Sequence, residues 1–230
     1  MIELVFDPKW FYGKEIIVDI FSVITLFLLT YFSLNYYRLN KNRNYFYLGA
    51  AFLMIGLSFL FKILTNFTIQ YQVITETRFG FLELIYYTTQ PTNVLFFIGF
   101  LLYRLLTLIG FYTLYGIYEK QSKQNTFLML YFILISTYFT RFTYFIFHAT
   151  SFVFLGFITM QYYSTYLKNK FYRTKVLAYS FVIIAVSQIF FTFATLYELS
   201  YLIGEIIQLI GYVLLLATLI MVLKYGKKKK

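Results

Sequence analysis

The chain has 230 residues, of which 60% are hydrophobic and only 13% are charged, and it carries a formal net charge of +11. These values exclude a water-soluble globular protein, because a soluble fold needs a charged surface and this chain has too few charges to provide one. Cysteine is absent and His148 is the single histidine, which excludes disulfides, thiolate zinc sites, iron–sulfur clusters and bis-histidine haem within the chain. We therefore expect an integral membrane protein without a metal or a cofactor.

Seven hydrophobic stretches follow one another along the chain, at about the length that crosses 30 Å of hydrocarbon as α-helix. They must be helical, because lipid cannot satisfy exposed backbone groups and the alternating pattern of barrel strands is missing. The fourth stretch is the shortest. The sequence thus predicts an all-α, seven-transmembrane helix bundle that forms a single domain, 1–230. The predicted spans are Ile16–Tyr37, Tyr45–Thr65, Asn93–Tyr118, Thr126–Thr140, Thr143–Leu167, Lys175–Tyr197 and Tyr201–Leu223.

The segment between the second and third spans, residues 66–92, is too apolar for a free loop and too interrupted by charge to cross a membrane. Its stretch FGFLELIYY is typical of a helix that lies in the membrane interface or of a lid. We expect this segment on the outer side of the membrane.

The orientation of the bundle follows from its basic residues, because Lys and Arg near the ends of spans are retained in the cytoplasm. Fourteen of the twenty cations lie in the loops after spans one, three and five or in the tail, whereas eight of the nine acids lie at or near the other side. We therefore predict an N-terminus outside and a C-terminus in the cytoplasm, in a multi-pass protein of the plasma membrane. The cations on the cytoplasmic side are Arg38, Lys41, Arg43, Lys120, Lys123, Lys168, Lys170, Arg173, Lys175, Lys224 and Lys227 to Lys230.

The lysine-rich tail, residues 224–230, is typical of a stop-transfer anchor that is attracted to acidic lipid headgroups. Docking of a cytoplasmic signalling partner is the alternative. Nucleic acid is not an expected partner, because the cations lie at the edges of the bilayer rather than on a soluble module with stacking aromatic residues.

An internal repeat is indicated by the third and seventh spans. Arg104 to Phe111 reads RLLTLIGF, and Glu205 to Tyr212 reads EIIQLIGY, so that Leu-Ile-Gly-aromatic aligns without gaps. Tyrosine pairs also precede the basic loops after spans one and five. These matches predict two parallel repeats of three helices joined by a fourth, a 3+1+3 pattern, with chance matching in a biased composition as the alternative.

Arg104 and Glu205 occupy equivalent positions in that repeat, carry opposite charges and lie within spans. Because an unpaired charge in a membrane costs a few kcal/mol, we expect the two residues to share a polar site in the bundle interior. An ion pair that only locks the third and seventh helices together accounts for them equally well.

Polar residues on three spans converge on this predicted site. Glu205, Gln208 and Tyr212 recur at helical spacing and form one stripe on the seventh span, together with Tyr201. His148 lies on the fifth span, where a helix-packing residue is the alternative to a ligand. The predicted ligand-binding residues are Arg104, His148, Glu205, Gln208 and Tyr212.

Four further charges near the outer helix ends form the predicted rim of a cavity open to the outside: Asp19, Lys62, Glu83 and Arg141. Each also has a simpler interpretation. Lys62 and Arg141 have side chains long enough to snorkel to the interface, and Asp19 suits the positive end of the first helix.

The seven-span architecture with its N-terminus outside is shared with receptors and microbial rhodopsins, but the seventh span has no interior lysine for a retinal Schiff base. The closing stretch GEIIQLIGYVLLLATLIMVLKYGKKKK resembles the last helix of heptahelical sensor modules that feed histidine kinases and related signalling proteins. This resemblance implies a sensor or receptor-like protein that binds a small or apolar ligand from outside and signals to a separate cytoplasmic partner.

A small-solute transporter is the alternative, since the chain resembles sugar-efflux and PQ-loop carriers in span count, orientation and repeat order. It departs from them in lacking the paired PQ motif and helical prolines, because Gln90-Pro91 is reversed and lies on the outer side. An intramembrane enzyme is only the third alternative, because no pair of catalytic acids, set of metal ligands or nucleophile with its base assembles in the pattern. A purely structural or assembly protein is a further alternative.

Overall fold

The computed structural model describes residues 15–74, 90–117, 122–140, 145–194 and 196–226. These residues form seven α-helices joined by turns, which confirms the all-α prediction. The helices are α1 (Glu15–Asn40), α2 (Arg43–Ile74), α3 (Gln90–Gly116), α4 (Lys123–Phe139), α5 (Phe145–Asn169), α6 (Tyr172–Thr192) and α7 (Glu198–Gly226).

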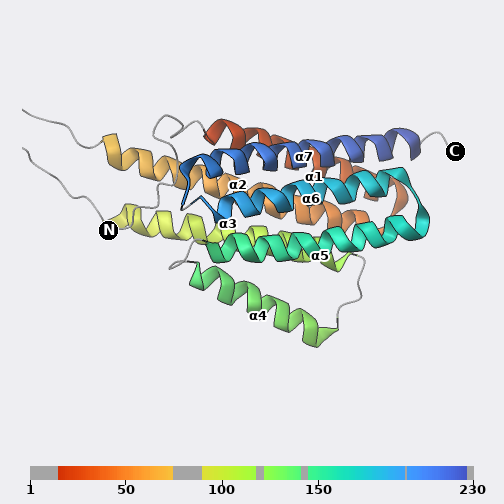
Figure 1. Ribbon diagram of the computed structural model, residues 1–230, viewed down its shortest axis with the longest axis horizontal. Helices are drawn as coiled ribbons and strands as arrows, with labels where there is room; N and C mark the ends of the chain where they lie inside the picture. The colour runs from red at the N-terminus through yellow and green to blue at the C-terminus, as the bar shows by residue number, and fades with distance from the viewer. Residues whose placement is uncertain (1–14, 75–89, 118–121, 141–144, 195, 227–230) are drawn as a thin grey trace, which may run out of the picture.

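Successive helices run in opposite directions along the long axis of the molecule (Figure 1). α1 begins at one end, and α7 finishes at the other. Six of the described helices are long and apolar enough to cross a membrane. The exception is α4, which has 17 residues and corresponds to the shortest predicted span. The structure therefore supports a multi-pass helical membrane protein.

The other six helices form a closed ring in which neighbours in the sequence are neighbours in space. α2 packs between α1 and α3, α6 packs between α5 and α7, and the contacts α1–α7 and α3–α5 close the ring. α4 lies outside this ring and touches only α3 and α5 among the described helices (Figure 1). Most of its large side chains are exposed, with Phe127 at 74% and Leu128 at 62%, as suits a helix that faces lipid, whereas Ile133 is 1% exposed.

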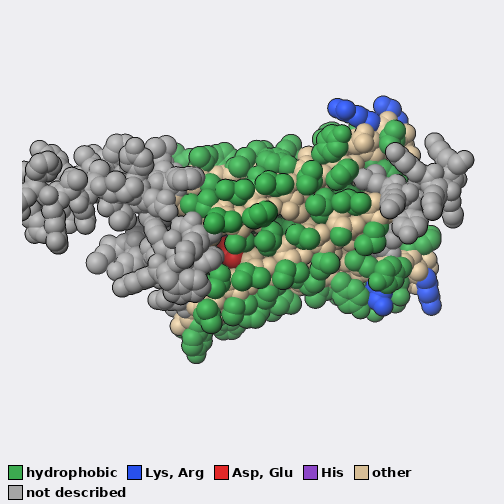
Figure 2. All heavy atoms as spheres, turned by 90° about the horizontal axis from the view of Figure 1, so that it is seen from above, with side chains coloured by type: hydrophobic (Ala, Val, Ile, Leu, Met, Phe, Trp, Pro, Cys, Tyr) green, Lys and Arg blue, Asp and Glu red, His purple; other side chains and the backbone are tan. Residues whose placement is uncertain are grey.

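One end of the bundle is basic. Here α1 turns into α2 and α5 turns into α6, and Figure 2 shows the visible Lys and Arg side chains gathered at this end. We call it the basic end, defined by Arg38, Lys41, Arg43, Lys168 and Lys170.

The two turns at the basic end have the same backbone structure. Lys41 and Lys170 each follow an asparagine, and each adopts a left-handed conformation with φ of 54°. In each turn the lysine N–H donates to the carbonyl four residues earlier at 2.7 Å, a bond that closes the preceding helix. Because each turn has only two residues between its helices, α1 and α2, like α5 and α6, must pack as antiparallel pairs.

The half of the ring toward the basic end has an apolar core. Leu26 and Leu29 of α1 and Leu155 and Ile158 of α5 are at most 1% exposed, and the rings of Tyr162 and Phe181 stack at 5.2 Å between centroids. Burial of such side chains from every ring helix stabilises the closed arrangement, since close packing drives helix association in lipid.

Two glycines allow neighbouring helices to approach closely. A Cβ atom on Gly110 of α3 would lie 2.6 Å from Cγ1 of Ile55 on α2. A Cβ atom on Gly211 of α7 would lie even closer to the same atom of Ile184 on α6. Only glycine fits such contacts, which explains the two Leu-Ile-Gly-aromatic sequences in packing terms.

Candidate buried charge cluster

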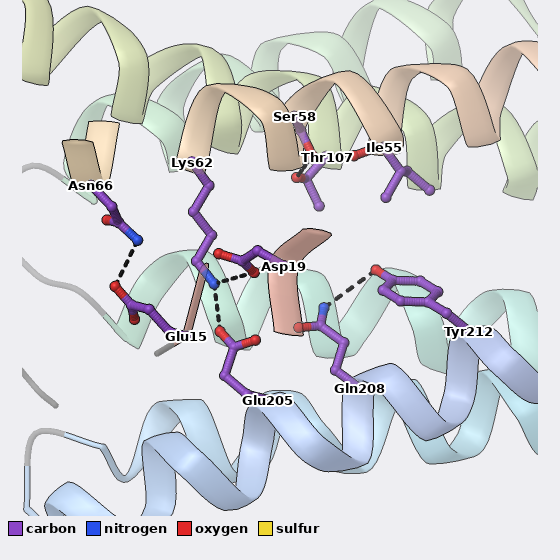
Figure 3. Close-up of polar contacts among 10 residues, drawn as sticks. All are labelled: Glu15, Asp19, Ile55, Ser58, Lys62, Asn66, Thr107, Glu205, Gln208 and Tyr212. Atoms are coloured by element: carbon purple, nitrogen blue, oxygen red, sulfur yellow. Dashed lines mark hydrogen bonds and ion pairs between the residues drawn. The ribbon is translucent and has the colours of Figure 1, made fainter. Parts of the chain in front are cut away.

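A lysine and two carboxylates meet inside the ring, in the half away from the basic end. Nζ of Lys62 lies 2.9 Å from Oδ1 of Asp19 and also pairs with Oε1 of Glu205 (Figure 3). Lys62 is 7% exposed, Asp19 0% and Glu205 1%. We call these three residues the charge cluster.

The geometry of three helices places the cluster. Asp19 lies one turn into α1, Glu205 lies two turns into α7, and Lys62 extends from α2 across the interior of the ring (Figure 3). The Lys62 ammonium is also 5.7 Å from the ring centroids of Phe59 and Tyr201. These aromatic faces favour the charge but cannot replace its carboxylate partners.

Glu205 therefore has a different partner from the predicted one. Arg104 and Glu205 are both buried, as expected for charges within spans, but the carboxylate pairs with Lys62. The guanidinium of Arg104 lies 4.8 Å from the centroid of the Phe100 ring, one turn earlier on α3. The proposed Arg104–Glu205 pair is thus replaced by a link between α2 and α7.

The structure places Lys62 and Asp19, two of the predicted rim residues, in the interior of the ring, and Lys62 does not snorkel to the interface. The Lys62 side chain turns into the ring, because an outward path would leave two buried carboxylates without a cation. Asp19 is fully buried against that ammonium rather than lying at a rim. The other two predicted rim residues, Glu83 and Arg141, lie outside the described residues.

A second polar contact lies next to the cluster, toward the same end of the bundle. Nδ2 of Asn66 donates to Oε1 of Glu15 at 2.6 Å, joining α2 to α1 one turn beyond the Asp19–Lys62 pair (Figure 3). Glu15 is only 6% exposed. The α1–α2 interface at this end therefore contains two polar contacts that are one helical turn apart.

The predicted stripe on α7 is confirmed as a buried face. Tyr201, Glu205, Gln208 and Tyr212 are all at most 8% exposed. Nε2 of Gln208 donates to the hydroxyl of Tyr212 at 3.3 Å (Figure 3). Helical spacing alone identified this face, because the four side chains belong to a single helix.

His148 is bonded on the other side of the ring. Its Nδ1 lies 2.9 Å from Oε1 of Gln188 on α6, and its ring centroid lies 4.9 Å from that of Phe191. His148 is 3% exposed. This geometry matches the helix-packing interpretation of His148, and Gln188 is a partner that the sequence analysis did not identify.

A group of aromatic rings packs beside the cluster. The Phe59 centroid lies 6.1 Å from that of Tyr103 and 5.8 Å from that of Tyr212, and Tyr103 in turn lies 5.4 Å from Phe147. These rings join α2, α3, α5 and α7 next to the cluster, where the Phe59 ring lies 5.7 Å from the Lys62 ammonium. Beside it, Thr107 of α3 donates to Ser58 of α2 at 2.8 Å.

The cluster offers charge rather than the ligands of a metal site. Among the described residues no group of three His, Cys, Asp or Glu side chains is placed to hold a metal ion. An ammonium between two carboxylates can instead exchange partners or respond to a further charge. Comparison of the chain with protein-family models, curated proteins and solved structures finds no match.

Proposed function

We propose that this protein is a receptor-like membrane sensor that binds a small solute from the side where the charge cluster lies. The observation that carries this proposal is the division of the ring. Asp19, Lys62 and Glu205 lie in the half away from the basic end, and a largely apolar core fills the half toward it. Such a division suits a binding site reached from one side better than a path through the protein.

The basic end supports the assignment of sides. Under the positive-inside rule, Arg38, Lys41, Lys168 and Lys170 belong in the cytoplasm, so the charge cluster lies in the outer half of the membrane. A solute would then enter from outside, and the C-terminal end of α7 would meet a cytoplasmic partner.

Transmission of the signal is proposed to run through α7. Glu205 ties this helix to Lys62 on α2, and the same helix continues to the basic end. A solute that competes for either carboxylate changes which packing of α2 and α7 is lower in energy, and a helix shift at the far end follows. The basic tail beyond α7 is our candidate contact for the partner.

The absence of native cysteine makes a direct test practicable. Spin labels on Gly116→Cys and Met221→Cys report the separation of α3 and α7 at the basic end, in protein reconstituted into nanodiscs. A panel of amino acids, sugars, nucleosides and amines is then screened. A sensor shows a changed distance distribution with at least one class, and Glu205→Gln abolishes the change. Unchanged distances across the whole panel argue against a solute-driven helix shift.

A small-solute carrier is the second candidate, and a repeated packing pattern favours it. Lys41 and Lys170 are separated by 129 residues, and so are Ile55 and Ile184, against which the two close-packed glycines lie. Ser58 and Ser187 have the same separation, and each donates to the carbonyl of its isoleucine, at 2.6 and 2.7 Å. These correspondences support our proposal of a 3+1+3 repeat with α4 as the connector.

Two matching halves could move against each other to transport a solute, with Lys62–Glu205 as a contact that opens and closes between them. Proteoliposomes distinguish the two functions. A carrier accumulates or exchanges a radiolabelled solute that changes the α3–α7 distance, whereas a sensor binds it without net uptake.

A further inference from the structure

We propose that the charge cluster holds one exchangeable proton, carried by the carboxyl group of Asp19. The formal charges of the three side chains in the cluster do not balance. Two ionised carboxylates and one ammonium leave a net charge of −1 in side chains that are almost fully buried. Among the described residues Lys62 is the one cation within 4.0 Å of either carboxylate. A single proton makes the cluster neutral.

One carboxylate oxygen of Asp19 is also without a hydrogen-bond partner among the described residues. Oδ1 of Asp19 accepts from Lys62, but Oδ2 is buried and has no hydrogen-bond partner among the described residues. A buried acceptor on an ionised carboxylate that lacks a donor carries a large desolvation cost. A proton on this oxygen removes the charge and with it most of that cost.

The other titratable and charged side chains around the cluster lie on α1, α3, α5 and α7, and among the described residues none of them forms an ion pair within 4.0 Å with Asp19 or Glu205. Glu15 on α1 adds a further acid and bonds to an uncharged amide. Tyr103 on α3 and Tyr201 on α7 are phenols, which cannot supply a positive charge. On the remaining faces, Arg104 lies against the Phe100 ring and His148 bonds to Gln188.

A proton suits this site better than a metal cation. The ammonium of Lys62 already occupies the position between the two carboxylates where a cation would bind (Figure 3). A sodium ion would also need several oxygen ligands, and the described residues hold no group of acidic and histidine side chains suited to a metal. A proton needs only one free oxygen, and Oδ2 of Asp19 provides it.

Infrared difference spectroscopy tests the proposal on the full chain in nanodiscs, comparing mildly acidic with mildly alkaline buffer. We expect the C=O band of a buried carboxylic acid to gain intensity in acid. Labelling wild-type protein with ¹³C in aspartate alone, or in glutamate alone, assigns the band without any substitution. The band is lost in Asp19→Asn with Glu205→Gln and is kept in Glu15→Gln, the matched control from the same helix.

Wild-type spectra recorded in sodium chloride and in choline chloride separate a proton from a metal cation. A band of equal intensity in both salts supports proton binding. A band that sodium removes, or a wild-type spectrum in which no buried acid gains a proton, overturns the proposal. Proton binding at this site requires neither a signalling partner nor transport, so its outcome is independent of the tests of function.

Discussion

The helix pair α1–α2 and the helix pair α5–α6 each contain a buried polar bond between their two helices, but the bond is charged in one pair and neutral in the other. Asp19 and His148 are separated by the same 129 residues as the two lysine turns, and each bonds across to the next helix. In the first pair of helices the bond is an ion pair with Lys62, and in the second it is a neutral bond with Gln188.

The difference shows what a buried charge requires. We call α1–α3 and α5–α7 the two sets of helices. The ammonium of Lys62 in the first set reaches a second carboxylate, that of Glu205 in the second set. The bond between His148 and Gln188 lies within the second set and satisfies groups without a formal charge. Charge thus ties the two sets of helices together, while the neutral contact acts within one set.

Removal of the Lys62 charge has the largest expected effect. Lys62→Met leaves two buried carboxylates without their cation, and breaking a buried ion pair in this way costs about 3–5 kcal/mol. We expect a large loss of stability in detergent, measured by thermal unfolding at several buffer compositions.

The matched control for this prediction is the triple variant Lys62→Met, Asp19→Asn, Glu205→Gln. It has no formal charge in the cluster, so it regains most of the stability that the single variant loses. A single variant as stable as wild type would mean that the cluster does not hold α1, α2 and α7 together.

The sequence alone was sufficient for the features that one helix encodes. The length and apolarity of the spans predicted the helices, and the spacing of Glu205, Gln208 and Tyr212 predicted the buried face of α7. The interior position of Arg104 also followed from its place in a long apolar stretch. Each of these inferences depends on periodicity or length, which are local properties of the chain.

The pairing within the cluster depends on how helices are rotated relative to one another, and no local pattern carries that information. Lys62 lies near a helix end that we predicted to face outside, so the sequence favoured snorkelling, although the burial of two carboxylates on other helices decided its direction. The repeat suggested Arg104 as the partner of Glu205, because it compared equivalent positions rather than facing ones. Gln188 was missed for the same reason, since its role depends on His148 of a different helix.

The glycine contacts give the second largest expected effect. In Gly211→Ala the added methyl group overlaps Ile184, which increases the distance between α7 and α6. In Gly110→Ala it overlaps Ile55, which increases the distance between α3 and α2. Overpacking of this kind costs about 1–3 kcal/mol. The two losses, measured by thermal unfolding, are expected to be similar if both sets of helices pack alike.

Gly156 of α5 supplies the control, because no atom lies within 4 Å of a Cβ built there. Gly156→Ala should be neutral or stabilise the helix by up to about 1 kcal/mol. A loss for Gly156→Ala equal to the other two would show that packing is not the cause.

Loss of the neutral polar contact has a smaller expected effect. Gln188→Leu removes the partner of His148, and interhelical hydrogen bonds in membranes contribute about 0.6 kcal/mol on average and up to about 1.7 kcal/mol. Its effect should fall clearly below that of Lys62→Met. A loss as large as that of the lysine variant would contradict the contrast between the charged and the neutral contact.

The smallest expected effect lies at α4, where Ser136 and Thr150 of α5 share a hydrogen bond of 2.8 Å. α4 is outside the ring, so Ser136→Ala removes one neutral bond and little packing, at a cost of about 0.6 kcal/mol. Limited proteolysis in detergent should show faster cleavage next to α4, with α1–α3 and α5–α7 still protected. Unfolding of the whole ring in this variant would instead show that α4 stabilises the contact between the two sets of helices.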